Sequence, residues 1–396
     1  MWEFTSPRKV IFGEDALDYL SDQEFTHAFI VTDPTMKKLH LAAIESRLNE
    51  TNTKITVFDE ILSEPTLEIV QKGGRAMSEA KPDVIIALGG GSVLDAAKGM
   101  WAVCADPGLN VEALDPFAKL GLREKTNCSL ITIPTTSGTG ADVTWAIVLT
   151  DTTEAVDRKI SLVNRELVAD VTILDPILTQ TMPKHLIAGT GLDALCHAID
   201  GYLSQWRNDI SDAFARHAFL LIWKNLPIAV DQVKNKGGVA VEIRDKLHVA
   251  ATMAGWAFGN SQIILAHSLA HAVGSVFKVP HSQCIGTMCW YSLMFNKVVE
   301  SQRIADLARL VGLHGTSNEE SATKFIDTFK KFLIKLNMPL SLKEMEIPKK
   351  KYESHFESLI NYALNDSGTL SNPRTINYND FVKIFEYIFE GKEIDF

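Results

Sequence analysis

The sequence has few cysteines, no extended basic cluster and no long apolar stretch, and each absence excludes a class of protein. The five cysteines are scattered and never spaced as Cys-x-x-Cys, so neither a disulfide framework nor a zinc knuckle is expected. With 39 Lys and Arg against 49 Asp and Glu, the formal net charge is −10, whereas binding nucleic acid needs a basic face. No apolar run approaches the roughly 20 residues of a membrane-spanning helix. We therefore expect neither a nucleic-acid partner nor a membrane span.

The first residues also lack the apolar core of a secretory signal peptide, so a cytoplasmic location is expected. Hydrophobic residues make up 46% of the chain and charged residues 22%, which is the ordinary globular range and excludes a largely disordered protein. A chain of 396 residues is long enough for about two to three domains of roughly 150 residues each. The composition thus predicts a folded, multidomain protein.

Short apolar runs alternate with segments of helical spacing in the first part of the chain. These runs are residues 28–32, 55–58, 84–88 and 129–133. The run at 84–88 is continuously apolar, as expected of a strand that is buried on both faces of a parallel sheet. Beyond about residue 180 the pattern becomes almost entirely helical. We therefore predict an α/β domain with a parallel sheet over residues 1–180 and an all-helical domain over residues 181–396.

Two glycine-containing turns follow predicted strands. Gly89-Gly90-Gly91-Ser92 stands between the run at 84–88 and the start of a helix, where exposed backbone N–H groups and the helix dipole favour an anion. The segment 135–140, Thr-Thr-Ser-Gly-Thr-Gly, follows another strand and suits a phosphate or a ribose. A tight turn without a ligand has a similar sequence, so both interpretations stay open at this stage.

Acidic and histidine residues recur at helical spacing in the second half. Asp193 and His197 are four residues apart, His267 and His271 repeat that spacing, and His281 follows shortly after. Residues four apart share one face of a helix, so these side chains are candidates for a site that binds Zn²⁺ or Fe²⁺. The alternative is that they are hydrogen-bonded histidines of the core.

Four motifs together resemble the iron-containing (group III) alcohol dehydrogenase family, which belongs to a superfamily with glycerol dehydrogenase and dehydroquinate synthase. They are GGGSVLDAAKG at 89–99, PTTSGTGADVT at 134–144, GLDALCHAIDGY at 191–202 and HSLAHAVGSVFKVPH at 267–281. The resemblance spans essentially the whole chain. It implies a Rossmann-like NAD-binding domain followed by an all-α metal-binding domain, in a dehydroquinate synthase-like architecture.

The resemblance also implies roles for individual residues. Those matched to the nucleotide site are Asp33, Gly90, Gly91, Ser92, Asp95, Thr135, Thr136, Thr139 and Lys159. Those matched to the ligands of one divalent metal, Fe²⁺ or Zn²⁺, are Asp193, His197, His267 and His281. His271 matches an additional histidine near the nicotinamide, with a role in proton relay or substrate orientation. Phe258 matches a position that lines the substrate pocket, and Asp200 stands where many members have Glu.

The implied activity is reversible hydride transfer between a small alcohol and NAD, with the aldehyde or ketone as substrate in reverse. The carboxylate of Asp33 would accept a hydrogen bond from the ribose and repel a 2′-phosphate, which favours NAD over NADP. Alternatives within the superfamily are a metal- and NAD-using synthase or lyase and a polyol dehydrogenase. Few Lys and Arg lie near the metal motifs, which favours a small neutral alcohol. A homodimer or larger homo-oligomer is expected from the resemblance.

Overall fold

The computed structural model describes residues 3–62, 64–111, 114–152 and 158–396, without the side chains of 158 and 159. Packing divides the chain into two compact units. The first is the described part of Met1–Met182 with Val239–Trp256, and the second is Pro183–Gly238 with Ala257–Phe396. The main division lies close to the predicted boundary at 180/181. The segment 239–256 differs from the continuous second domain that the sequence predicts, because it packs with the first unit.

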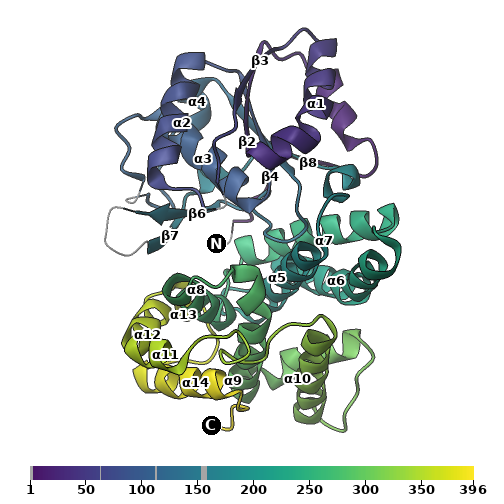
Figure 1. Cartoon of the computed structure of the whole chain (residues 1–396), viewed down its shortest axis with the longest axis vertical. Helices are drawn as coiled ribbons and strands as arrows, with labels where there is room; N and C mark the ends of the chain where they lie inside the picture. The colour runs from purple at the N-terminus through teal and green to yellow at the C-terminus, as the bar shows by residue number, and fades with distance from the viewer. Residues whose placement is uncertain (1–2, 63, 112–113, 153–157) are drawn as a thin grey trace. The chain divides into compact units, whose positions relative to one another are not determined.

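The first unit is built from alternating strands and helices, as the sequence predicts (Figure 1). Its strands are β1 Lys9–Phe12, β2 His27–Thr32, β3 Lys54–Phe58, β4 Val84–Gly89, β5 Ser129–Pro134, β6 Ala146–Asp151, β7 Arg158–Val163 and β8 Val171–Leu174. Its α-helices before the division are α1 Pro34–Glu50, α2 Leu67–Ala80, α3 Gly91–Ala105 and α4 Leu122–Thr126. Short 3₁₀ helices are η1 Ala16–Asp22, η3 Arg165–Leu167 and η4 Pro176–Thr179.

Among the described residues, six strands form a parallel sheet in the order β1-β8-β5-β4-β2-β3, and β6 pairs with β7 in a separate antiparallel hairpin. The chain runs from β2 outward to β3, returns to β4 on the other side of β2, and then continues to β5. The order therefore reverses between β2 and β4. In open parallel sheets, ligands bind beyond the carboxyl ends of the strands at such a reversal.

Side chains of the central strands point alternately to the two faces of the sheet and belong to two separate apolar clusters. Phe29 of β2 and Ile85 of β4 belong to one buried cluster, which includes residues of α2 and α3. Ile30 and Ile86, their neighbours in sequence, point to the opposite face and join a cluster with residues of α1 and η1. Successive residues of a strand face opposite sides of a sheet, so helices on both sides fix the register of β2 and β4.

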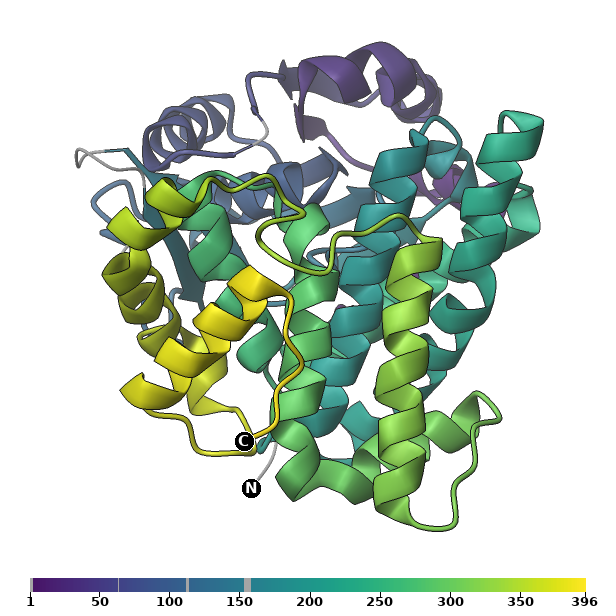
Figure 2. The same ribbon diagram turned by 60° about the horizontal axis from the view of Figure 1, so that its bottom comes forward.

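The second unit is helical throughout its regular structure (Figure 2). Its helices are α5 Lys184–Leu203, α6 Asp209–Lys236, α8 Leu265–Phe277, α9 His281–Leu310, α10 Asn318–Lys335, α11 Lys349–Ser354, α12 Phe356–Leu364, α13 Ser367–Leu370 and α14 Tyr378–Glu390. Helix α7, Val241–Gly259, begins in the first unit and ends in the second. In α9, Glu300 has non-helical dihedral angles (φ −119°, ψ 25°), so the helix is kinked at this residue.

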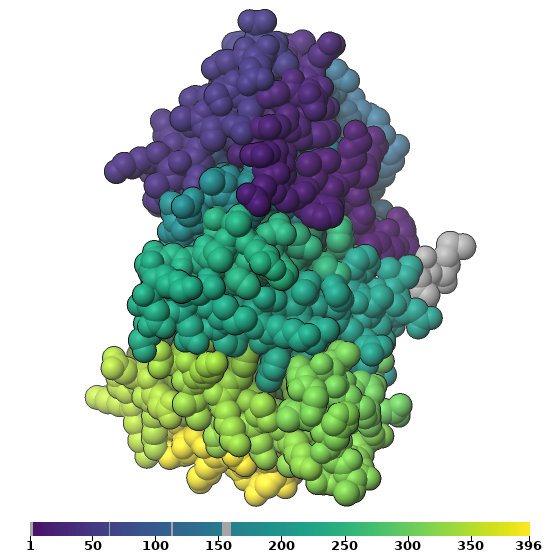
Figure 3. All heavy atoms as spheres, turned by 90° about the vertical axis from the view of Figure 1, so that its right-hand side faces the viewer, coloured from purple at the N-terminus to yellow at the C-terminus, as the bar shows by residue number. Residues whose placement is uncertain are grey.

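The C-terminal helices of this unit pack on one another and on α8 and α9. In the space-filling view the C-terminal residues, in yellow, lie against yellow-green residues that precede them in the chain (Figure 3). Within the described ranges, no helix combines the length and the apolar character that spanning a bilayer requires.

Candidate metal centre and nucleotide-binding edge

Helix α5 presents the first two candidate metal ligands. Asp193 and His197 lie one turn apart on a helix whose residues from Ile187 to Leu203 are buried. The side chains are 7% and 8% exposed, although both groups are polar. Their four-residue spacing places them on the same face of the helix, so the carboxylate and the imidazole approach each other.

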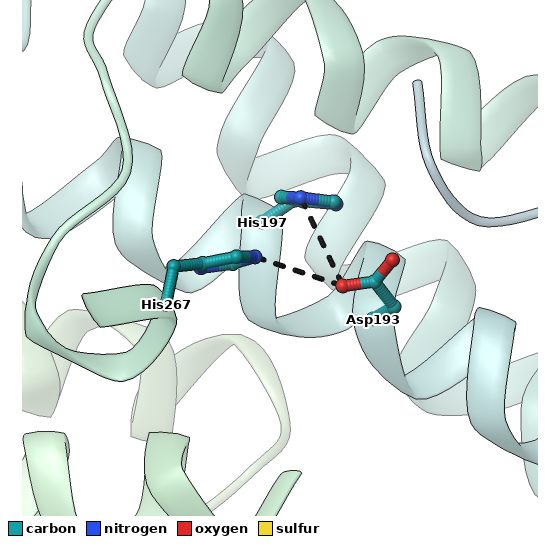
Figure 4. Close-up of side chains that lie close together, drawn as sticks. All are labelled: Asp193, His197 and His267. Carbon is teal, nitrogen blue, oxygen red and sulfur yellow. Dashed lines mark ion pairs between the residues drawn. The ribbon is translucent and has the colours of Figure 1, made fainter. Parts of the chain in front are cut away.

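Two further histidines from α8 and α9 complete the cluster. Each of the three imidazoles directs Nε2 at the same carboxylate oxygen, Asp193 Oδ1. The distances to this oxygen are 3.8 Å from His197, 3.6 Å from His267 and 3.3 Å from His281. Figure 4 shows the convergence of His197 and His267 on Asp193. The structure therefore brings together the four residues that the resemblance matches to metal ligands.

The donor set fits a divalent cation. Ligands bonded at about 2.0–2.2 Å in a tetrahedral arrangement lie about 3.3–3.6 Å apart, close to the separations observed here. Among the described residues, the buried atoms Asp193 Oδ1 and His267 Nε2 have no hydrogen-bond partner. Burying a polar atom without a hydrogen-bond partner costs free energy of folding. A cation between these two atoms would remove that cost, because both can donate an electron pair to it.

The electrostatics of the cluster favour positive charge beside Asp193. Burial raises the pKa of Asp193, but His197, His267 and His281 outweigh it and hold this pKa well below 3.8. Burial lowers the pKa of His267, whereas Asp193 and Asp200 raise it, with a net value of about 9. Burial also lowers the pKa of His281. The carboxylate is thus anionic, and either a proton on His267 or a metal cation balances its charge.

The structure places both candidate catalytic side chains beside this cluster. The ring of Phe258 stacks on His197 with centroids 4.1 Å apart and an interplanar angle of 16°. The ring of His271 lies with its centroid 5.4 Å from that of His281 and 5.9 Å from that of His267. Phe258 therefore covers one face of a candidate ligand, and His271 adds a further imidazole next to the donor set.

Two carboxylates that the sequence analysis did not include among the candidate site residues contact these histidines. Asp366 Oδ2 lies 2.8 Å from His271 Nδ1, and Asp200 Oδ2 lies 2.7 Å from His267 Nδ1. Burial raises the pKa of Asp366, but its contacts, His271 above all, lower it to about 2. Asp200 carried a signal in the sequence, because it follows Asp193 by seven residues, on the same helix face. Asp366 lies 95 residues from its histidine and carried none.

In the first unit, the two glycine-containing turns lie against each other at the carboxyl edge of the sheet. Gly90 is the N-cap of α3, and the first N–H groups of a helix have no partner within it. A methyl group built on Gly91 would lie 2.9 Å from Thr139 Cγ2, and one built on Gly90 would lie 3.5 Å from Thr136. The close approach of the turns requires glycine at 91 and leaves a helix N-terminus suited to a pyrophosphate.

Asp33 lies at the same edge, beyond the end of β2. The pairing of Thr32 with Leu88 places it beside the start of the glycine turn, where the strand order reverses. Its Oδ1 accepts hydrogen bonds from the backbone N–H groups of Thr35 (2.7 Å) and Met36 (3.0 Å), so it also caps α1. The turn interpretation and the nucleotide interpretation of Asp33 are therefore compatible.

The remaining predicted nucleotide residues differ in their surroundings. Thr135 is buried, and Ser92 is half-buried in the first turn of α3. Asp95 is buried in α3, where its Oδ2 accepts a hydrogen bond from Val148 N in β6 at 3.0 Å, and burial raises its pKa to about 6. The backbone of Lys159 lies in β7, but its side chain is outside the described residues.

Comparisons with known proteins agree with this architecture. The family description "Iron-containing alcohol dehydrogenase" matches residues 7–176, and "Fe-containing alcohol dehydrogenase family, C-terminal" matches residues 187–389. The chain is 33% identical over 399 residues to an NADPH-dependent butanol dehydrogenase from Clostridium saccharobutylicum, covering 100% of both chains.

It is also 32% identical over 414 residues to aldehyde-alcohol dehydrogenase 2 from Entamoeba histolytica, covering 97% of this chain and 46% of that protein, so it spans about half the length of that relative. Among solved structures, it superposes on an alcohol dehydrogenase from Oenococcus oeni with a TM-score of 0.90 at 27% identity, covering 98% of this chain and 100% of that one. The chain therefore belongs to the iron-containing alcohol dehydrogenase family and is a metal-dependent alcohol dehydrogenase that uses a nicotinamide nucleotide.

Proposed function

We propose that this alcohol dehydrogenase interconverts short primary alcohols and their aldehydes with NAD, and that Asp193, His197, His267 and His281 hold its cation. One observation carries the proposal: three imidazole Nε2 atoms surround a single buried carboxylate oxygen at 3.3–3.8 Å. Three neutral imidazoles and one carboxylate suit Fe²⁺ or Zn²⁺, and the family name favours iron. The synthase, lyase and polyol dehydrogenase alternatives are not favoured by the matches.

When bound by these residues, a cation would supply Lewis acidity toward the alcohol oxygen and a nicotinamide nucleotide would supply a hydride acceptor. The chain's own residues set the conditions for this chemistry. Phe258 covers a face of His197 and limits the access of water to that ligand. His271 is held through Nδ1 by Asp366, so its Nε2 can accept or return the proton of the alcohol, directly or through water.

The choice of NAD over NADP rests on Asp33. A carboxylate at the end of β2 accepts hydrogen bonds from a ribose but repels a 2′-phosphate. The relative from Clostridium saccharobutylicum is NADPH-dependent, so the ratio of kcat/KM for the two nucleotides is the deciding measurement. A ratio in favour of NADP⁺ would contradict the assignment.

The substrate class has two supports. The scarcity of Lys and Arg near the metal motifs, together with the aromatic ring of Phe258, disfavours anionic or highly polar substrates. The name of one full-length relative, a butanol dehydrogenase, also points to a short alcohol. A panel of C2 to C6 alcohols, diols and aldehydes tests this, with the highest kcat/KM expected for unbranched primary alcohols. A preference for polyols or for charged substrates would overturn it.

The metal site is tested with the His267→Ala variant. We expect the purified variant to lose its metal and its turnover but to bind the nucleotide with unchanged affinity, because the nucleotide turns belong to the other unit. Metal analysis, turnover and nucleotide titration are the three measurements. Full turnover by a metal-free His267→Ala protein would refute the proposed site.

The expected homodimer or larger homo-oligomer stays a prediction. Light scattering of the purified protein tests it.

A further inference from the structure

Asp200 is a buried carboxylate that the proposed chemistry does not use. It lies on α5, three residues after His197 and seven after Asp193, and it is 0% exposed. Among the described residues, its ion-pair partner is His267. Taking a carboxylate out of water is costly unless its charge is compensated, so its presence here requires a reason.

The geometry shows what this carboxylate holds. Asp200 Oδ2 lies 2.7 Å from Nδ1 of His267 and accepts a hydrogen bond from the backbone N–H of Ile264 at 3.0 Å. Ile264 is the N-cap residue of α8, and His267 is in the first turn of that helix. One oxygen therefore contacts both the start of the helix and the ring that the helix carries.

These contacts determine which nitrogen of His267 can bind a cation. A carboxylate beside Nδ1 keeps the proton on that nitrogen, so the lone pair of the neutral ring is on Nε2. Nε2 is the atom that faces Asp193 Oδ1 at 3.6 Å and has no hydrogen-bond partner in the described part of the chain. The ring is thus oriented with its donor atom toward the cluster.

We infer that Asp200 is a positioning residue of the cation site, which fixes the tautomer and orientation of His267 and strengthens it as a ligand. The inference rests on the proposed metal site. A carboxylate behind a metal-binding imidazole increases the basicity of the ring, and its loss typically weakens metal affinity by about 10- to 100-fold. The same helix that supplies Asp193 and His197 thereby also orients the third ligand.

A second aspartate, Asp366 at the N-cap of α13, offers a matched control because it contacts another histidine of α8. Asp366 accepts from Nδ1 of His271 at 2.8 Å, one helical turn after His267, but His271 is not among the proposed ligands. The two pairs have the same chemistry and differ in whether the histidine binds the cation. Removing the charge of Asp366 should therefore leave metal affinity within about twofold of wild type, whereas removing that of Asp200 should not.

The experiment compares the affinities of the full-length protein and its variants for Zn²⁺ and Co²⁺, by competition with a chelator. Asp200→Asn keeps an oxygen that can accept from Ile264 but removes the charge. We expect its affinity to fall about 10- to 100-fold. Asp200→Glu, which restores the carboxylate, should recover most of that loss, and Asp200→Gln should not. If Asp200→Asn does not fold, the Glu and Gln pair still isolates the charge.

The outcomes separate this inference from the proposed function. If the wild-type protein binds neither ion, the metal site itself is wrong. If wild type binds and Asp200→Asn or Asp200→Gln binds equally well, the carboxylate is only a helix cap and the inference is overturned. An equal loss in Asp366→Asn would also overturn it, because the effect would then not depend on the ligand histidine. The d–d absorption of bound Co²⁺ is a further measure, and it should change in Asp200→Gln but not in Asp366→Asn.

Discussion

His248 and Ser137 are 111 residues apart in the sequence, yet His248 Nδ1 and Ser137 Oγ are hydrogen-bonded at 3.0 Å. Ser137 belongs to the second glycine-containing turn, and His248 lies on α7, in the segment that packs with the first unit. One helical turn later, Thr252 Oγ1 donates to Asp142 Oδ2 at 2.7 Å. Helix α7 therefore supports the turn that the resemblance assigns to the nucleotide.

His248 makes the stability of the protein sensitive to acid. Burial lowers its pKa from 6.5 to about 4, so the unfolded chain takes up a proton as pH falls below 6.5 while the folded chain does not. This stability contribution is present above pH 6.5 and is lost between pH 6.5 and about 4, to a total of about 3 kcal/mol. Denaturant unfolding of wild type and His248→Leu across that range should show a shallower decline in the variant. Parallel curves would contradict the prediction.

The charge of Asp33 should determine nucleotide preference. Asparagine is as good an N-cap as aspartate, so Asp33→Asn keeps the cap of α1 while removing the charge. We expect the kcat/KM ratio of NAD⁺ to NADP⁺ to fall about tenfold or more, with no change in melting temperature. Asp33→Ala serves as the control for the cap, and should lose about 1 kcal/mol of stability. An unchanged ratio in Asp33→Asn would show that another group selects the nucleotide.

The two glycines of the first turn should respond differently to alanine. In Gly91→Ala, the added methyl group would lie 2.9 Å from Thr139 Cγ2, so we expect about 1–3 kcal/mol of destabilisation together with a raised KM for the nucleotide. Gly90→Ala has its nearest neighbour at 3.5 Å and should keep its stability. Its methyl group would still hinder a pyrophosphate at the N-terminus of α3 and raise KM. Equal stability of the two variants would contradict this packing.

Phe258 should affect the alcohol more than the metal. Replacing it with Ala removes the ring stacked on His197, and we expect a KM for short alcohols that is about tenfold higher, equivalent to about 1.4 kcal/mol of lost contact. Metal content should remain as in wild type, because all four proposed ligands are present. Phe258→Leu keeps an apolar side chain at this position, so its KM for short alcohols should lie between those of wild type and Phe258→Ala. Loss of the metal in Phe258→Ala would instead assign the ring a role in holding His197.

The sequence predicted the sheet, the helical second half and the pairing of Asp193 with His197, because each depends on local periodicity. The approach of His267 and His281 to these residues depends on how α5, α8 and α9 pack, and spacing contains no information about it. The resemblance to a family supplied that link. The structure brings the four side chains together, and their role as metal ligands stays a prediction.

The support of the nucleotide edge was less predictable. Lys98 is fully buried in α3 and donates to the carbonyl oxygens of Thr144 (2.8 Å) and Ala146 (3.2 Å). Nothing in a helical pattern indicates which distant carbonyl a buried lysine will meet. The contact between His248 and Ser137 is equally long-range, and for the same reason residues 239–256 were expected with the second domain.

The arrangement of α5 has a consequence for how the centre comes into being. Asp193, His197 and Asp200 rise from consecutive turns of one buried helix, so their mutual spacing is set as soon as that helix has formed and packed. An incoming metal ion then meets two proposed ligands, Asp193 and His197, whose spacing the helix has already fixed, and Asp200 one turn further on is placed to orient a third. Assembly of the centre therefore depends on α8 and α9 bringing His267 and His281 to a pair of side chains that α5 has already positioned.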